Sequence, residues 1–145
     1  MLFRSGADLD QQNFSALLST VEQGASGNAG KIVLHANSLQ LENGGGITSR
    51  NDGIGSGGSI TLDITGALTL TGFGLTTASS LLNPTIQFDT PWPSRIESSA
   101  GVNENSQSIR GGDIQIYAGS LLIKEGASLS SSTHACIILI LSKLF

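Results

Sequence analysis

Four residues of types that take part in acid–base chemistry and ligand binding recur at one place of a repeated phrase in this 145-residue chain. Each stands three residues after an isoleucine, and the four are His35, Asp63, Asp89 and Tyr117. On strands stacked in register, these side chains form one outward-facing ladder. Two carboxylates about 5 Å apart beside a histidine can act as general acid and base or hold a cation. The alternative, which we favour, is that these residues are polar only because they face solvent.

Trp92 is a second candidate binding residue. It lies between Pro91 and Pro93 and close to Arg95. An aromatic ring on a rigid loop is what a sugar-binding surface uses for stacking. A single tryptophan is more often packed against its own scaffold, and we favour that interpretation.

The other residue patterns indicate neither catalysis nor a metal site. His134 and Cys136 supply two soft ligands with no second pair at zinc spacing. The serine-rich run 128–132 is expected to be a solvated strand face, because the chain lacks the Gly-x-Ser-x-Gly turn that exposes a nucleophile. We therefore expect no enzyme activity, no metal and no cofactor. The single cysteine also excludes an internal disulfide.

The charge balance excludes nucleic acid as a partner. Seven basic residues against eleven acidic ones give a net charge of -4, which cannot neutralise a phosphate backbone. Residues 1–8 lack the apolar stretch of a secretory signal peptide. The apolar run 135–141 is shorter than the ~20 residues that span a bilayer, so we expect no membrane-spanning segment.

A glycine-rich phrase followed by alternating apolar residues recurs along the chain and predicts the elements that position these side chains. The isoleucine that begins each alternation stands at 32, 60 and 114, so the gaps are 28 and 54. Because 54 is twice 27, we expect a degenerate copy at Ile86. Each alternation is typical of a strand with one buried face. The four strands are predicted at 32–34, 60–62, 86–88 and 114–116.

The first and last copies also agree beyond the isoleucine, at a constant offset of 82. This offset places Leu39, Leu41, Gly44, Ile47 and Ser49 opposite Leu121, Ile123, Gly126, Leu129 and Ser131. In the second copy the matching residues are Leu68, Leu70, Gly72 and Leu75, with a shift of one residue at Gly66-Ala67. Prolines interrupt the third copy, so a protruding loop is expected at about 78–95.

Three short strands per repeat of about 27 residues predict an all-β fold, a parallel β-solenoid of four to five coils. A β-sandwich is the rival fold, but it does not account for the constant offset. Residues 1–133 are predicted to form one solenoid segment. Residues 134–145 are predicted to be an unrelated apolar tail, consistent with a shifted reading frame near Thr133. Uncapped terminal coils expose strand edges, so we expect end-to-end self-association.

The phrases Gly27-Asn28-Ala29-Gly30-Lys31-Ile32, Ser38-Leu39-Gln40-Leu41-Glu42-Asn43-Gly44-Gly45 and Gly112-Asp113-Ile114-Gln115-Ile116 resemble the repeat region of filamentous-haemagglutinin-like exoproteins. The resemblance covers roughly residues 14–133. It implies a right-handed parallel β-helix, two-partner secretion through an outer-membrane transporter, and an extracellular or cell-surface location. It also implies adhesion, with surface glycans or other cell-surface molecules as partners. The secretion domain of that family has no match here, so the chain is expected to be a fragment of a longer parent.

These observations favour a non-catalytic, structural or adhesive segment of a secreted, cell-surface protein. Two alternatives remain open. One is a polysaccharide-acting β-helix enzyme, similar to pectin lyases, that uses Asp63 and Asp89. The other is a passive spacer without a ligand.

Overall fold

The structure, a computed structural model, describes residues 1–4, 15–79, 87–100, 110–132 and 135–142. Within these residues the secondary structure is all β, without a helix. The strands are β1 (Leu2–Arg4), β2 (Ala16–Val21), β3 (Ile32–Ala36), β4 (Leu39–Glu42), β5 (Gly46–Asn51), β6 (Ile60–Thr71), β7 (Phe73–Ser79), β8 (Gln87–Pro93), β9 (Arg95–Ala100), β10 (Ile114–Lys124), β11 (Ser128–Ser131) and β12 (Ile137–Leu141).

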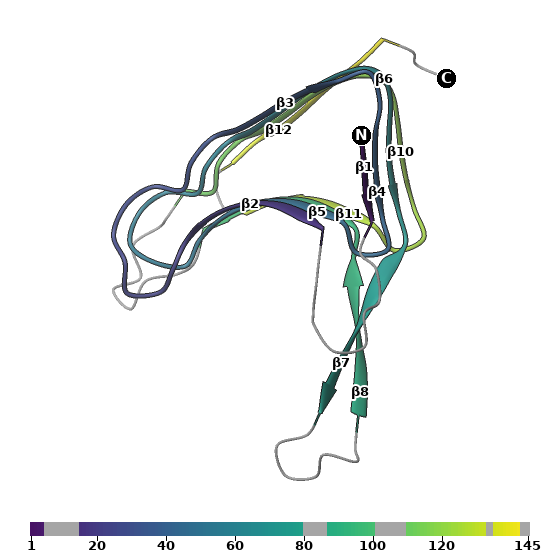
Figure 1. Cartoon of the computed structure of the whole chain (residues 1–145). Coiled ribbons are helices and arrows are strands. Elements are labelled where there is room, and N and C mark those ends of the chain that lie inside the picture. The colour runs from purple at the N-terminus through teal and green to yellow at the C-terminus, as the bar shows by residue number, and fades with distance from the viewer. Residues whose placement is uncertain (5–14, 80–86, 101–109, 133–134, 143–145) are drawn as a thin grey trace.

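All but two of these strands belong to three parallel strand stacks. The first stack contains β3, the first half of β6, the first half of β10, and β12. The second contains β1, β4 and the second halves of β6 and β10. The third contains β2, β5, β9 and β11. The first two stacks form one sheet that turns a corner, and the third lies opposite as a separate sheet (Figure 1).

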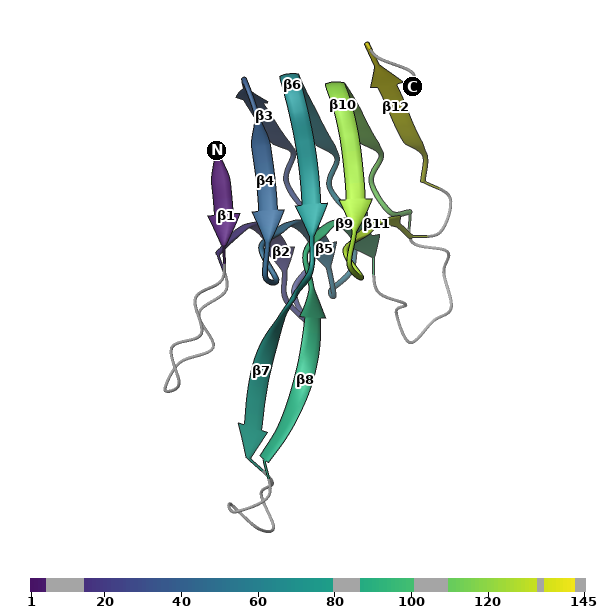
Figure 2. The same cartoon turned by 90° about the vertical axis from the view of Figure 1, so that its right-hand side faces the viewer.

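Successive repeats of the chain lie side by side along the stacking direction, which Figure 2 shows from the side. One passage through the three stacks is called a layer below. The two long strands β6 and β10 connect the first stack to the second. Their register shifts between Ala118 and Ser120, where Ile64 and Ala67 are the partners, so β6 has one extra residue at the corner. This bulge lies where the sequence predicts a one-residue shift.

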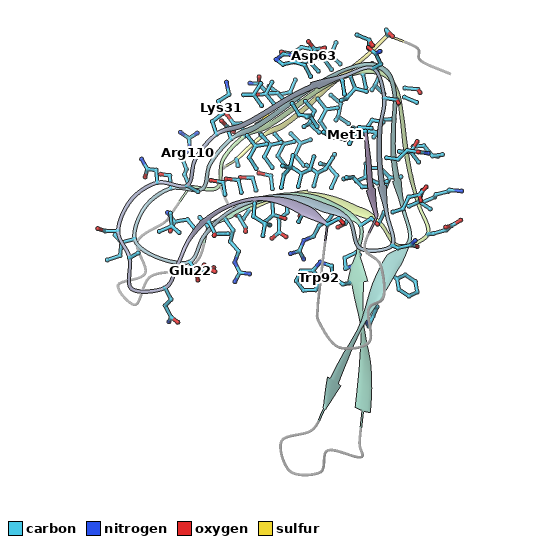
Figure 3. All side chains as sticks on the ribbon, viewed as in Figure 1. Met1, Glu22, Lys31, Asp63, Trp92 and Arg110 are labelled. Carbon is cyan, nitrogen blue, oxygen red and sulfur yellow. The ribbon has the colours of Figure 1, made fainter. Side chains whose placement is uncertain are left out.

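The core fills the space between the two sheets with stacked aliphatic side chains (Figure 3). Alternation along each strand places every second residue inward. The same residue type therefore recurs at the same position of neighbouring layers. Fully buried examples are Ile60 beside Ile114, Leu39 beside Leu68, and Ile47 beside Ile96. The predicted pairing of the first and last copies is confirmed through this middle layer.

The predicted extra copy at Ile86 is wrong. Ile60 pairs directly with Ile114, so no layer separates these two isoleucines. Ile86 itself lies outside the described residues, and the strand that follows it, β8, pairs antiparallel with β7. The match of Leu75 to Ile47 is also wrong, because Ile96 is the partner of Ile47 and Leu75 lies in β7. The period is therefore regular only between the repeats that begin at Ile32 and Ile60.

The β7–β8 pair is a hairpin that projects from the corner between the second and third stacks (Figure 2). The sequence predicts a protrusion at about 78–95, and the hairpin strands begin earlier, at Phe73, and end at Pro93. Ser94 attaches its base to the scaffold. The buried Ser94 hydroxyl donates to the Thr71 carbonyl at 2.8 Å and accepts from the Gly44 N–H at 3.0 Å.

Glycines in the repeated phrase allow neighbouring layers to approach closely. A methyl group added at Gly58 would overlap the carbonyl oxygen of Gly30, and one at Gly112 would overlap the carbonyl oxygen of Gly58. The three glycines lie two residues before the three isoleucines that begin the first stack. Their place in the repeat thus follows from backbone-to-backbone packing.

A ladder of serines inside the third stack holds this glycine backbone. Ser49 and Ser98 are fully buried and Ser131 is partly buried. The Ser98 hydroxyl donates to the Gly58 carbonyl at 2.8 Å and accepts from the Gly112 N–H at 2.9 Å. The expectation that the serines of residues 128–132 form a solvated face is therefore wrong for Ser131, which donates to Gly112.

The apolar segment after residue 134 continues the scaffold. Strand β12 pairs in parallel with β10, with Ile137 beside Ile114 and Leu139 beside Ile116. The prediction of an unrelated tail is wrong for Ile137–Leu141. An apolar run without glycine can form a strand of the stack because the neighbouring strand supplies its hydrogen-bonding partner.

Candidate functional site

The structure brings three of the four predicted ladder residues together. His35, Asp63 and Tyr117 occupy neighbouring positions on β3, β6 and β10. All three side chains are exposed on the outer face of the first stack, and Figure 3 shows Asp63 pointing away from the core. Ile140 of β12 is the next residue in this ladder.

The fourth predicted residue, Asp89, does not belong to the ladder. Its backbone lies in β8, opposite Thr77 of the projecting hairpin. The physical reason is that the 54 residues from Ile60 to Ile114 form one layer with an insertion rather than two layers. The pair of neighbouring carboxylates on which the acid–base hypothesis depends is therefore not formed.

His35 and Asp63 form an exposed contact. His35 Nδ1 lies 3.2 Å from Asp63 Oδ2, and the two side chains are 70% and 53% exposed. Water screens such a contact, so it adds little to stability. On its other side, Asp63 is the register partner of Tyr117 on β10.

An open hollow of about 220 Å³ lies next to this contact. It spans β6, β10 and β12 and is lined by Asp63, Ile64, Thr65, Tyr117, Ala118, Gly119, Ile140 and Ser142. Tyr117 is 39% exposed and Ile140 is 51% exposed. The lining thus combines an accessible aromatic ring and an apolar side chain with one carboxylate and the hydroxyls of Thr65 and Ser142.

This combination is suited to binding a sugar. Aromatic faces stack on the apolar side of sugar rings, and carboxylate and hydroxyl oxygens accept their hydroxyl protons. Hydrolysis of a glycosidic bond usually needs two carboxylates that flank the bond, and the described part of the lining supplies one, Asp63. Among the residues that the structure describes, no lysine or arginine lines the hollow, so this part of the lining disfavours an anionic ligand.

Trp92 lies at the base of the hairpin, below the third stack (Figure 3). The Arg95 guanidinium carbon is 4.0 Å from the centre of its ring. Arg95 Nε is in turn 3.2 Å from Glu97 Oε2, although its N–H does not point at that oxygen. One face of the Trp92 ring is therefore covered by Arg95, and the side chain is partly buried. This geometry favours packing over ligand stacking.

The remaining chemistry-bearing residues form no cluster in the described ranges. Cys136 is exposed, and its N–H donates to Asp113 Oδ1 at 3.0 Å. His134 lies outside the described residues. Within the residues that the structure describes, no group of three histidine, cysteine, aspartate or glutamate side chains could hold a metal ion. Among the same residues, there is also no helix with the length and apolar character needed to cross a membrane.

Six residues that line the hollow are not among the candidates predicted from the sequence: Ile64, Thr65, Ala118, Gly119, Ile140 and Ser142. Thr65 lies within the bulge of β6, between Ile64 and Ala67, and Ile140 and Ser142 belong to the segment predicted to be unrelated. If Ile137 is aligned with the isoleucines that begin the earlier repeats, Ile140 becomes a ladder residue, because Ile140 stands three residues after Ile137.

No family model, curated protein or solved structure matches this chain.

Proposed function

We propose that this chain is a structural and adhesive segment of a secreted, cell-surface protein, and that it is not an enzyme. Its layers are proposed to follow a right-handed parallel β-helix, whose full-length parent is exported through an outer-membrane transporter. The in-register parallel stacks, the buried aliphatic ladders and the serine–glycine ladder support this fold. A scaffold of this kind holds exposed side chains at fixed spacing.

The observation that carries the adhesive part of the proposal is the hollow beside Tyr117 on the outer face of this scaffold. Its aromatic ring, its carboxylate and the absence of lysine and arginine from the described lining suit a neutral glycan. Adhesion through a weak sugar site is effective when many copies act together, because linked sites bind with higher avidity.

Glycan binding by purified protein tests this proposal. Wild-type protein and variants are immobilised on beads and probed with neutral and acidic oligosaccharides. We expect binding to a neutral oligosaccharide that falls at least tenfold in Tyr117→Ala and is retained in Tyr117→Phe, which keeps the stacking surface. Gln115→Ala is the matched control, because Gln115 is on the same face of β10 but does not line the hollow.

Two results would contradict the proposal. The first is an absence of binding to every glycan tested, which would favour the passive spacer. The second is release of new reducing ends from a polysaccharide, abolished by Asp63→Asn, which would favour the enzyme.

A further inference from the structure

One asparagine and one aspartate of the chain are each followed directly by glycine, at Asn43-Gly44 and Asp52-Gly53. Such pairs are prone to succinimide formation, in which the glycine nitrogen attacks the side-chain carbonyl carbon of the preceding residue. Glycine favours the reaction because it has no side chain to hinder its own nitrogen. The hydrogen bonds of the two glycine N–H groups therefore decide whether the folded chain can react.

Asn43 and Gly44 are the central residues of the tight turn between β4 and β5. Their φ angles are 51° and 88°, and the Gly45 N–H donates to the Glu42 carbonyl at 3.0 Å, which closes the turn. Two central residues with positive φ are typical of a type I′ turn, for which Asn-Gly is a preferred sequence. Asn43 is exposed, whereas Gly44 is buried. Water thus reaches the residue that would be attacked but not the attacking nitrogen.

The Gly44 N–H is bound by a buried acceptor. It donates to the Ser94 hydroxyl at 3.0 Å, and this hydroxyl donates its own proton to the Thr71 carbonyl at 2.8 Å. Ser94 is fully buried. The Gly44 nitrogen can attack only after it has lost its proton to a base. A serine hydroxyl is too weak a base to take this proton, and it keeps water away from the N–H.

The base of the hairpin also encloses the Gly44 backbone. A Cβ atom built on Gly44 would lie 3.0 Å from the Gly74 nitrogen and 3.1 Å from the Trp92 carbonyl oxygen. Gly74 and Trp92 are partners in the β7–β8 pairing. Gly44 therefore has little room to turn toward the Asn43 side chain while the hairpin is attached to the scaffold.

The second pair, Asp52-Gly53, is held in the same way by a different side chain. The Gly53 N–H donates to Asn51 Oδ1 at 2.9 Å. Asn51 is fully buried, and its Nδ2 donates to the carbonyls of Gly27 and Ser56, which fixes the direction of Oδ1. In both pairs, the glycine nitrogen is thus bonded to a buried side chain.

We propose that Asn43 is a latent deamidation site, which the Ser94 hydroxyl keeps unreactive while the hairpin base is attached to the scaffold. When this contact opens, the Gly44 nitrogen loses its proton to water and attacks Asn43 Cγ. A C–N bond forms, the bond from Cγ to the side-chain nitrogen breaks, and ammonia leaves with the proton that the backbone lost. Water then opens the succinimide ring to aspartate or isoaspartate, so one water is consumed and one ammonia is released.

The reaction would make opening of the hairpin base irreversible. Isoaspartate adds a methylene group to the backbone of a turn that joins two strands in fixed register, so the original turn cannot form again. Aspartate instead adds a negative charge beside Glu42. The proposal depends on the turn and the hairpin base, and not on the proposed adhesive function.

The equivalent turn of the last layer provides a control substitution. Glu125 and Gly126 have φ angles of 55° and 80°, and the Ala127 N–H donates to the Lys124 carbonyl at 3.2 Å. Glutamate therefore forms the same turn, and its longer side chain cannot form the five-membered ring. Asn43→Glu should keep the turn and abolish ammonia release from this position.

Peptide mass spectrometry of the folded full chain tests the proposal. Wild-type protein, Ser94→Ala, Ser98→Ala and Asn43→Glu are incubated at mildly alkaline pH. Deamidation at residue 43 and isomerisation at Asp52 are measured over time, with isoaspartate peptides separated by chromatography. Ser98→Ala is the matched control, because Ser98 is an equally buried serine that bonds two backbone groups outside this turn.

We expect deamidation at residue 43 to be at least fivefold faster in Ser94→Ala than in the wild-type chain, and within twofold of wild type in Ser98→Ala. The rate at Asp52 should not change in Ser94→Ala, because Asn51 still binds its glycine N–H. An unchanged rate at residue 43 in Ser94→Ala would overturn the proposal. Equal acceleration at residues 43 and 52 would also overturn it, because general unfolding would then set the rate.

Hydrogen exchange of the wild-type chain keeps the test decisive if Ser94→Ala fails to fold. The Gly44 N–H should exchange at least tenfold more slowly in the native chain than in the same chain unfolded in urea. Deamidation at residue 43 should be slowed in the same comparison. Equal native and unfolded rates of either process would contradict protection by the Ser94 contact.

Discussion

The close approach of neighbouring layers predicts that Gly58→Ala destabilises the protein strongly. The new methyl group would meet the Gly30 carbonyl oxygen and the Ser49 hydroxyl well inside van der Waals contact, and it would lie 2.8 Å from the Ala29 carbonyl oxygen. Two of these atoms belong to backbone that cannot move without separating the layers. Overpacking of this kind costs about 1–3 kcal/mol. Shifting Gly58 also weakens the hydrogen bond from Ser98, which contributes about 1 kcal/mol.

We therefore expect a loss of about 2–4 kcal/mol in the free energy of unfolding. With a slope of about 2 kcal/mol per molar urea, the midpoint of unfolding should fall by about 1–2 M. Circular dichroism during urea titration is the assay. Gly46→Ala is the matched control, because Gly46 is also buried in the scaffold but its added methyl group would find no atom closer than 3.7 Å.

Gly46→Ala should change the stability by less than about 1 kcal/mol, since alanine fits and restricts the unfolded chain. Equal stability of the two variants would refute the reasoning, because it would show that the layers do not touch at Gly58.

Two further substitutions probe the serine ladder and the outer face. Ser98→Ala should lower the free energy of unfolding in urea by about 2–3 kcal/mol, because it leaves the buried Gly58 carbonyl and Gly112 N–H without their hydrogen-bonding partner. Ser99→Ala, on the opposite face of β9, is the control and should change this free energy little. Asp63→Asn should change thermal stability by less than about 1 kcal/mol, because its contact with His35 is exposed; a larger loss would show a structural role for this pair.

The sequence predicts the ladders well where stacking demands the same residue type in each layer. Leu39, Ile47 and Ser49 agree with Leu121, Leu129 and Ser131 because each position has one neighbour above and one below. The sequence could not separate a hairpin strand from a strand of a layer in the residues after Ile86, because both have an alternation of period two. The phrase Ile96-Glu97-Ser98, which matches Ile47-Thr48-Ser49, was the signal for the true layer.

The candidate site was predicted only in part, for the same reason. His35, Asp63 and Tyr117 follow from correct repeats, and Asp89 follows from the false one. The inward direction of Ser49 and Ser98 was missed because serine is usually exposed. Its hydroxyl is satisfied here by the glycine backbone, which the sequence pattern alone does not reveal.

The arrangement of layers is tested most directly by a disulfide between Thr61→Cys and Gln115→Cys in a Cys136→Ser background. Both side chains face outward, and the two residues pair in register on β6 and β10. Adjacent strands lie about 4.8 Å apart, within the range that a disulfide bridges, whereas an intervening layer would separate the residues by about 9.6 Å. We expect rapid, intramolecular oxidation of this pair in the folded protein. Failure of the folded double-cysteine variant to oxidise would contradict the direct pairing of the two repeats and the layered scaffold built on it.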